Sequence, residues 1–341
     1  MAHRSLSLAS VPAQPGAGAV RLAGWVALVA AAVACVASVI YLGNLGFGWF
    51  TDWATYDHAV ERFLHGQPLY APFQLESPYL LPLATGVGFI YPPPAILLFV
   101  PFALVPGGQA LWVALNVGLL VTGMAAVLRR ELGTIAPWPL ALTLFGLALF
   151  VPFGAAVASG EITLGFTGIL AWAWTAGGRR QWVGPASGVG AVVKVQPGIL
   201  VAWAWRVEGW RGAARGVAVG AAICLATLPL FGLGPWFDYL HALSNTTPYC
   251  DGAHYSVACT LVPFTSVAVA KAAGSAVAGL CALGVILVRN RTLAFALLAV
   301  ATLAPVTDMH WYYLLTFYVV LVVVVATSIR ARRDRLAAAA A

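Results

Sequence analysis

Six long apolar segments are the strongest constraint on how this chain can fold. Each has the roughly 17–25 residues that a helix needs to cross a bilayer, and they lie at residues 22–45, 109–128, 138–158, 213–232, 272–288 and 311–328. Only 9% of the 341 residues are charged, whereas soluble domains carry about 25%. An all-α polytopic membrane protein is therefore predicted. Two shorter apolar stretches, 162–176 and 293–306, are weaker candidates for further spans.

One further apolar stretch, residues 183–205, is interrupted by helix-breaking residues. It contains Gly184-Pro185 and Lys194-Val195-Gln196-Pro197, and proline removes a backbone donor and clashes with the preceding turn. Two half-helices meeting at Lys194 to Pro197, or one broken helix, are predicted. The chain then has about ten crossings, or eight if this stretch is a re-entrant hairpin.

The arginines predict the orientation, since cytoplasmic loops carry an excess of basic residues. With the N-terminus inside, every arginine except Arg62 falls on the cytoplasmic side. This holds if residues 91–106, whose apolar part is short and bracketed by prolines, stay at the interface. The expected organisation is a disordered cytoplasmic tail (1–21), a transmembrane domain (22–328) and a cytoplasmic basic tail (329–341). Two extracytoplasmic loops, 46–108 and 233–260, follow from it.

The first of these loops carries four of the chain's eleven carboxylates, among them Asp52 and Asp57. Asp52 lies between aromatic residues at the outer interface, where partial desolvation makes a carboxylate a better base. The alternative is an N-cap for a helix predicted at 53–65, and position alone favours the cap. Asp57 and Glu61 share one face of that helix, and for Glu61 a solvated position is expected.

Two more polar groups interrupt apolar sequence. Glu161, in Ser159-Gly160-Glu161, lies at an outer membrane border, where acids are commonly functional. Lys194 is costly in apolar surroundings and is expected to bind an anion in preference to snorkelling to the interface. The chain turn at Pro197 leaves backbone N–H groups available to a phosphate.

The last predicted span begins with Asp308-Met309-His310-Trp311-Tyr312-Tyr313. Histidine side chains titrate near neutrality in general, so His310 is a candidate proton relay, with Asp308 to orient it. The alternative is an interfacial aromatic belt with an incidental histidine, and this segment alone favours the belt narrowly.

The sequence gives weaker indications of a disulfide, and few of metal, cofactor or nucleic-acid binding. Cys250 and Cys259 lie nine residues apart in the second outer loop, where an oxidising exterior permits a disulfide. The chain lacks Cys and His spacings typical of zinc sites and a Gly-rich phosphate loop, so no metal and no cofactor are expected. The net charge of +7 is scattered between apolar runs, which argues against nucleic-acid binding.

Taken in order, these features resemble the membrane glycosyltransferases of the GT-C class. The chain is similar to glycosyltransferase family 87, the polyprenol-phosphate-mannose-dependent α-mannosyltransferases of actinobacteria, which include the PimE-like enzymes. The resemblance rests on motifs spread over residues 30–328: Asp52-Trp53 with Tyr56; Gly66, Pro68, Leu69 and Tyr70; Phe89 with Tyr91-Pro92-Pro93-Pro94 and Pro101; Lys194 with Pro197; Gly234, Phe237 and Tyr239; and Pro305 with His310.

This resemblance implies a GT-C fold and a lipid-linked sugar donor that is used on the extracytoplasmic face of a bacterial plasma membrane. A sugar, mannose above all, would pass to a glycolipid or cell-envelope glycan. Asp52 would be the catalytic carboxylate, Lys194 would hold the donor phosphate, and His310 would assist deprotonation. Tyr56, Asp57, Tyr91, Glu161 and Asp308 are expected to bind substrate. The family often has Gln where this chain has Glu161.

Two other classes of function remain open from the sequence. A transporter or flippase of a lipid-linked sugar would share the apolar scaffold and the lysine at position 194, but has no need of a long acidic outer loop. A structural or assembly membrane protein would leave the outer acids unexplained.

Overall fold

The computed structural model describes residues 17–76, 78–79, 88–133, 137–177, 181–248, 250, 256–307 and 309–340. These residues are helical without a strand, apart from one isolated bridge between Tyr79 and Thr246. The prediction of an all-α protein is confirmed. The first half contains α1 (Ala17–Leu42), η1 (Gly43–Phe47), α2 (Thr51–Leu64), α3 (Pro72–Glu76), η2 (Pro93–Ala95), α4 (Ile96–Ala103), α5 (Gly108–Leu132), α6 (Pro137–Leu149), α7 (Val151–Ser159) and α8 (Thr163–Thr175). The second half contains α9 (Val183–Val193), η3 (Gln196–Ile199), α10 (Leu200–Glu208), α11 (Trp210–Phe231), α12 (Gly234–Asn245), α13 (Val257–Leu261), α14 (Val267–Leu287), α15 (Arg291–Leu303), η4 (Trp311–Leu314) and α16 (Leu315–Ala340).

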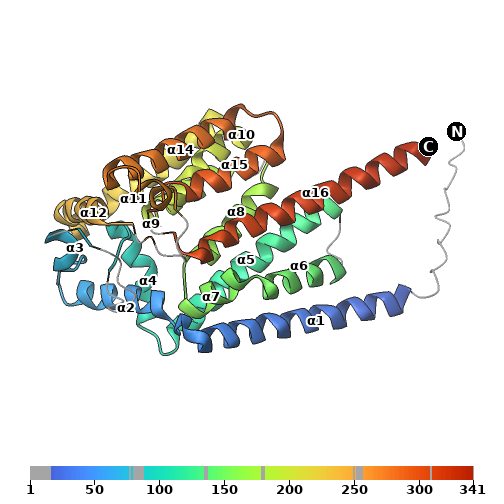
Figure 1. The fold of residues 1–341 in the computed structure, drawn as a ribbon, viewed down its shortest axis with the longest axis horizontal. Helices are drawn as coiled ribbons and strands as arrows, with labels where there is room; N and C mark the ends of the chain where they lie inside the picture. The colour runs from blue at the N-terminus through green and yellow to red at the C-terminus, as the bar shows by residue number, and fades with distance from the viewer. Residues whose placement is uncertain are drawn as a thin grey trace, which may run out of the picture.

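The long helices form two packed groups (Figure 1). Helix α5 packs on α8 and α16, and α1 packs on α6, while α11 packs on α9 and α14 on α15. Helices α2, α3, α4 and α12 lie together at one end, and the first turns of α1 and the last turns of α16 lie at the other (Figure 1). The short helices of both predicted outer loops therefore share one end of the molecule.

Within the described residues, five segments are long and apolar enough to cross a membrane: Gly18–Leu45, Gly108–Leu132, Trp210–Phe231, Val267–Leu287 and Trp311–Ala340. Helices α6 and α7 make a sixth if the bent pair is one span. The chain is thus a multi-pass membrane protein by length and composition, and the count of about ten crossings stays a prediction.

Three predicted boundaries differ from the structure. The segment 138–158 is not a single helix, because α6 and α7 meet at 75°, where Phe150 is extended and Pro152 opens the next helix. Helix α1 begins at Ala17, inside the stretch expected to be a tail. Helix α16 runs to Ala340 through the predicted basic tail, where Arg330 and Asp334 form an i,i+4 ion pair.

The two interruptions predicted from proline are present. Helix α9 ends at Val193, and η3 separates it from α10. Helix α4 has eight residues, which is about 12 Å of helix and too short to cross a hydrocarbon core of about 30 Å. Residues 91–106 therefore enter the fold as a short helical turn that packs against α2 and α5.

Helices α9 and α11 approach closely along a row of glycines. A Cβ at Gly184 would lie 2.1 Å from the Gly212 carbonyl oxygen, and one at Gly188 would lie 2.2 Å from that of Gly216. Small residues four apart on both helices let membrane helices pack backbone to backbone. This contact fixes the end of α9, and with it Lys194.

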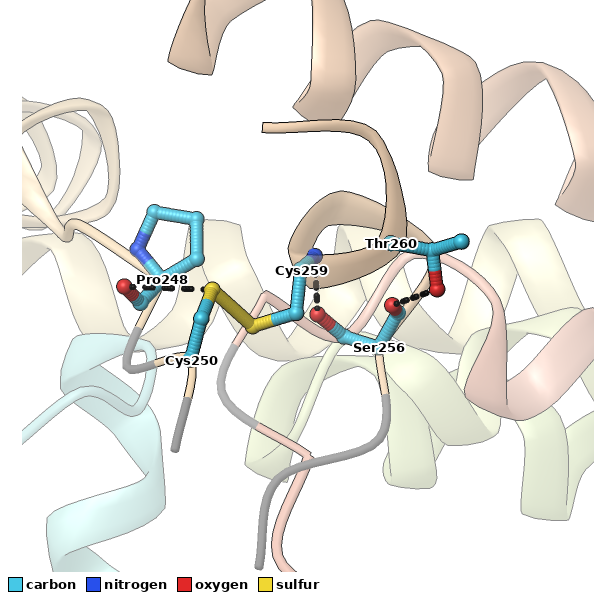
Figure 2. Close-up of a disulfide and its surroundings, with 5 residues drawn as sticks. All are labelled: Pro248, Cys250, Ser256, Cys259 and Thr260. Atoms are coloured by element: carbon cyan, nitrogen blue, oxygen red, sulfur yellow. Dashed lines mark hydrogen bonds between the residues drawn. A yellow bond between two sulfur atoms is a disulfide. The ribbon is translucent and has the colours of Figure 1, made fainter. Parts of the chain in front are cut away.

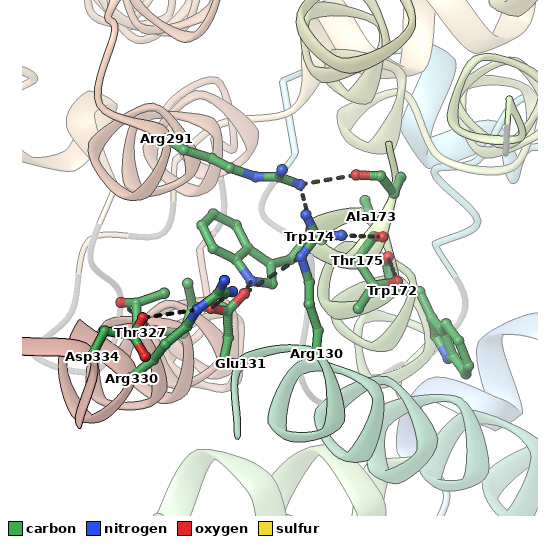
Figure 3. Close-up of polar contacts among 12 residues, drawn as sticks. Arg130, Glu131, Trp172, Ala173, Trp174, Thr175, Arg291, Thr327, Arg330 and Asp334 are labelled. Atoms are coloured by element: carbon green, nitrogen blue, oxygen red, sulfur yellow. Dashed lines mark hydrogen bonds and ion pairs between the residues drawn. The ribbon is translucent and has the colours of Figure 1, made fainter. Parts of the chain in front are cut away.

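Arginines gather around the C-terminal end of α8 (Figure 3). Arg130 donates to the Thr175 carbonyl at 2.6 Å, and Arg291 donates to the Trp174 carbonyl at 2.6 Å. Both oxygens lie at the C-terminal end of α8, where cations stabilise unpaired carbonyls. The buried Glu131 accepts a hydrogen bond from Trp174 at 2.9 Å and pairs with Arg130 and Arg330. We call the side chains of Arg130, Glu131, Trp174, Arg291 and Arg330 the arginine cluster.

Candidate active site

Helix α2 starts against the end of α7, and this contact places Asp52. The backbone N–H of Phe50 donates to the Ala158 carbonyl at 2.7 Å. Phe50 has a φ of 58°, a left-handed conformation that is unusual for a bulky residue and marks local strain. Asp52 is the second residue of α2, and its helix start shows no side-chain cap. The capping alternative for Asp52 is therefore wrong.

Asp52 lies in surroundings that favour its protonated form. Burial, and after it the negative charge of Glu161, raise the pKa of Asp52 to about 7. A hydrogen bond from Ser159 and the charges of His310 and Lys194 act in the opposite direction. A carboxyl that titrates near neutrality is suited to take a proton from a hydroxyl.

A tight turn between α7 and α8 places Glu161. Gly160 is left-handed with a φ of 76°, and a Cβ there would lie 3.3 Å from the Cβ of Trp53. Trp112 fixes the turn by donating from Nε1 to the Gly160 carbonyl at 2.9 Å. The Glu161 side chain is 2% exposed. Its Oε1 accepts from Lys194 and Thr163, at 2.8 and 2.5 Å, and its Oε2 accepts from Tyr56 at 3.0 Å.

Lys194 lies immediately after α9 in an extended conformation and is 5% exposed. Its Nζ donates to Glu161 at 2.8 Å, to the Tyr313 hydroxyl at 3.0 Å and to Thr163 at 3.3 Å. It also lies over the rings of Tyr313 and Tyr91, at 4.8 and 5.4 Å from their centroids. All three ammonium protons therefore have acceptors, and the charge is balanced by Glu161.

Two tyrosines connect the first loop to this ion pair. The hydroxyls of Tyr56 and Tyr91 lie 3.0 Å apart, and because Tyr56 donates to Glu161, Tyr91 is the donor to Tyr56. Both rings belong to an aromatic core with Phe99 and Trp112, in which Tyr56 stacks on Phe99 at 4.2 Å between ring centroids. The aromatic core makes the polar group rigid.

The segment before α16 completes the site. His310 acts electrostatically on Asp52, and its ring stacks on Tyr312 at 5.1 Å. Residues from four distant parts of the chain thus meet: α2, the α7–α8 turn, the end of α9 and the η4 segment. Asp308 lies outside the described residues.

The structure brings together most, though not all, of the predicted side chains. Asp52, Tyr56, Tyr91, Glu161, Lys194 and His310 gather as described. Asp57 lies instead beside His58 and Glu61, whose charges act on it. Thr163 and Tyr313 had no predicted role. Tyr313 stands in the aromatic run after His310, which was the only signal for it. Among the described residues, no group of three His, Cys, Asp or Glu side chains could hold a metal ion.

Two hollows adjoin the site. A cavity of about 40 Å³ lies next to Lys194 and is walled by Thr163, Thr167, Gln196, Tyr313 and other residues of α8, α15 and α16. A largely apolar groove of about 350 Å³ lies between α9 and α11 and reaches Pro92, Trp236 and Tyr239. Val195, next to Lys194 in the chain, lines this groove.

The second predicted outer loop is tied to the first. Tyr79 donates its backbone N–H to the Asn245 carbonyl at 3.0 Å, and Asn245 Nδ2 donates to the Gln74 carbonyl at 3.1 Å. A disulfide joins Cys250 and Cys259 beside α13 (Figure 2). The other cysteines, Cys35, Cys224 and Cys281, are free.

Comparison with known proteins gives one match. The model of glycosyltransferase family 87 matches residues 89–306, more than half of the chain. No curated protein matches, and neither does any solved structure. Tyr91, Glu161 and Lys194 lie within the matched residues, and Asp52 and His310 lie outside them. An all-helical, multi-pass membrane protein that this family model matches over most of its length is a glycosyltransferase, and the chain belongs to glycosyltransferase family 87.

Proposed function

We propose that the protein moves a sugar, most simply mannose, from a polyprenyl-phosphate donor to a hydroxyl of a membrane glycolipid or cell-envelope glycan. One observation carries the proposal: Asp52, Lys194 and His310 meet at one site, next to an apolar groove. A carboxyl that titrates near neutrality supplies the base, and a cation beside a lipid-sized groove suits a phosphate with an apolar chain.

The proposed reaction is a single displacement. The acceptor hydroxyl gives its proton to the Asp52 carboxylate, assisted by His310, while its oxygen forms a bond to the anomeric carbon of the donor sugar. The bond from that carbon to the phosphate oxygen breaks, and polyprenyl phosphate leaves with the electron pair. Lys194 stabilises the charge on the departing phosphate, so the step needs no metal. Attack opposite to the leaving group inverts the anomeric centre.

The apolar groove between α9 and α11 is the proposed position of the prenyl chain. Gly188, Gly216 and Gly220 are among the residues that line it, and they bring no side chain into the groove. Val217, on the groove wall, is 67% exposed, and α11 is one of the candidate membrane spans. A hydrocarbon chain that enters from the bilayer would thus remain in apolar surroundings up to Val195.

Two features support an extracytoplasmic site in a bacterial plasma membrane. The arginine cluster lies at the opposite end of α8 from Glu161 (Figure 3), and basic residues favour the cytoplasmic side. The Cys250–Cys259 disulfide lies in the loop that contacts the first outer loop (Figure 2), and disulfides persist in oxidising compartments. The N- and C-termini are cytoplasmic in this orientation.

The test is transfer from a defined donor. Purified protein is incubated with radiolabelled mannosyl-phosphopolyprenol and a membrane glycolipid extract. We expect label in the glycolipid fraction, and a loss of about 10²–10⁴-fold in rate for Asp52→Asn. The control is Glu61→Gln, an exposed carboxylate on the same helix, which should retain the wild-type rate. Equal transfer by wild type and Asp52→Asn would exclude Asp52 as the base. Movement of the donor across liposomes without transfer would overturn the proposal.

A further inference from the structure

Lys194 has no spare hydrogen-bond capacity for a donor phosphate. Its three protons go to Glu161, Thr163 and Tyr313, and it is 5% exposed. A phosphate that binds this ammonium must therefore replace one of these three acceptors. Two of them are neutral hydroxyls, and the third is a carboxylate that carries the same charge as the phosphate.

If Glu161 loses its contact with Lys194, it still keeps other hydrogen-bond partners. Tyr56 donates to its Oε2 and Thr163 to its Oε1, and both bonds come from helices other than α9. The cavity of about 40 Å³ beside Lys194 leaves room for the ammonium to move. The contact between Glu161 and Lys194 is consequently the one in this group that a competing anion can exchange.

We propose that Glu161 is a positioning residue that occupies Lys194 between turnovers, and that the phosphate of the lipid-linked donor displaces its carboxylate from the ammonium. This inference rests on the proposed function. The chemical class of the ligand is a singly charged phosphodiester with an apolar chain.

The charges around Glu161 determine how this exchange depends on pH. The titratable groups around it are Tyr56 of α2, Tyr91 before η2, Lys194 after α9, and Tyr312 and Tyr313 of η4. Asp52 and His310 lie close by. With both carboxylates ionised, a bound phosphodiester adds a third negative charge opposite Lys194 and His310. Donor binding therefore favours the state in which one carboxyl holds a proton, and affinity falls as pH rises.

The experiment measures equilibrium binding in nanodiscs with a prenyl methyl phosphodiester, a probe that keeps one negative charge at every pH used. For the wild type, we expect affinity at pH 8.5 to be weaker than at pH 5.5 by about tenfold or more. Glu161→Gln should bind more tightly than wild type at pH 8.5, with a much smaller change with pH. Glu161→Asp, which keeps the charge, should retain the dependence on pH.

Two controls separate the effect of the Glu161 charge from an effect on folding. Thr163→Val removes a neutral partner of Lys194 and should follow the wild-type pH dependence, and melting temperature and elution profile report folding of each variant. Wild-type affinity that does not change with pH, or equal behaviour of Glu161→Asp and Glu161→Gln, overturns the inference. Equal affinities of wild type and Glu161→Gln also overturn it and leave the transferase proposal standing. Absence of probe binding to both proteins overturns the lipid-phosphate donor as well.

Discussion

Two buried carboxylates, Glu131 and Glu161, lie at opposite ends of α8, and they are held differently. Glu131 pairs with Arg130 and Arg330. Arg130 and Arg291 also donate hydrogen bonds to carbonyls at the C-terminal end of α8. Glu161 relies on the single cation Lys194, and its remaining partners are hydroxyls. Positive charge is plentiful at the first site and is limited at the second.

This difference separates a structural clamp from a reactive site. At the arginine cluster each carboxylate charge is matched, and the side chains fasten α5, α8 and α16 together (Figure 3). At the other end Lys194 is committed to Glu161, so that burial and Glu161 outweigh it and raise the pKa of Asp52 to about 7. An incompletely balanced group of acids is what base catalysis near neutral pH requires.

Removal of Lys194 should have the largest effect on both stability and transfer. Lys194→Met leaves Glu161 buried without a cation, which costs about 3–5 kcal/mol of unfolding free energy and abolishes transfer. The double variant Lys194→Met/Glu161→Gln should recover most of the stability but none of the activity. Thermal melting and initial rates check both. Lys271→Met, at the chain's other lysine, is the control, and a loss of stability there as large as at Lys194 would contradict the argument.

Filling the apolar groove should show whether the prenyl chain of the proposed donor binds there. Val217→Trp is expected to raise the KM for the lipid donor by about tenfold or more, since burial of about two methylene groups is lost. Val189→Trp is a matched control, because Val189 is 47% exposed on the neighbouring helix α9 and is not among the groove residues. The same KM in both variants would place the prenyl chain elsewhere.

The dependence of the rate on pH should differ between the wild type and Glu161→Gln. Because the pKa of Asp52 is raised to about 7 and the base must be deprotonated, the rate should rise as pH increases through about 7. Glu161→Gln removes a negative charge that raises the pKa of Asp52, so this limb should move to lower pH. The measurement is kcat/KM for the donor between pH 5 and 9, which reports the pKa of the free enzyme. A limb that stays in place would show that Glu161 does not act on the base.

The smallest effect is expected at the arginine cluster. Arg330→Met removes one partner of Glu131 and leaves Arg130 and Trp174 in place. Arg330 is about half exposed, so the loss of unfolding free energy should be below about 1 kcal/mol. Thermal melting tests this, and transfer rates should not change. A loss as large as that of Lys194→Met would mean that the two buried carboxylates depend equally on one cation.

Local rules in the sequence account for much of the fold. Proline and glycine placed the interruption between α9 and α10, and prolines made α4 short. The same rule was missed at Pro152, since a long apolar run conceals a bend between α6 and α7. The end of α16 was missed because hydropathy stops at the membrane, whereas helix propensity continues through the alanines and charged residues that follow.

The site was predictable as a set of residues but not as a geometry. Acids, a lysine and a histidine in apolar sequence pointed to Asp52, Lys194 and His310. The ion pair of Lys194 with Glu161 joins residues 33 positions apart, and its hydroxyl partner Tyr313 is 119 positions further on. Such pairs depend on how helices pack, and a single sequence does not contain that information.

The ties between distant segments determine when the enzyme becomes competent during its synthesis. Helix α2 and its aspartate leave the ribosome early, but Tyr79 pairs with residues around Thr246, and Lys194 is hydrogen-bonded to Tyr313. The ribosome delivers Thr246 before α14, and it delivers His310 and Tyr313 only as the last helix begins. The candidate site is therefore completed last, because a partly synthesised chain still lacks His310 and the Tyr313 hydroxyl that binds Lys194.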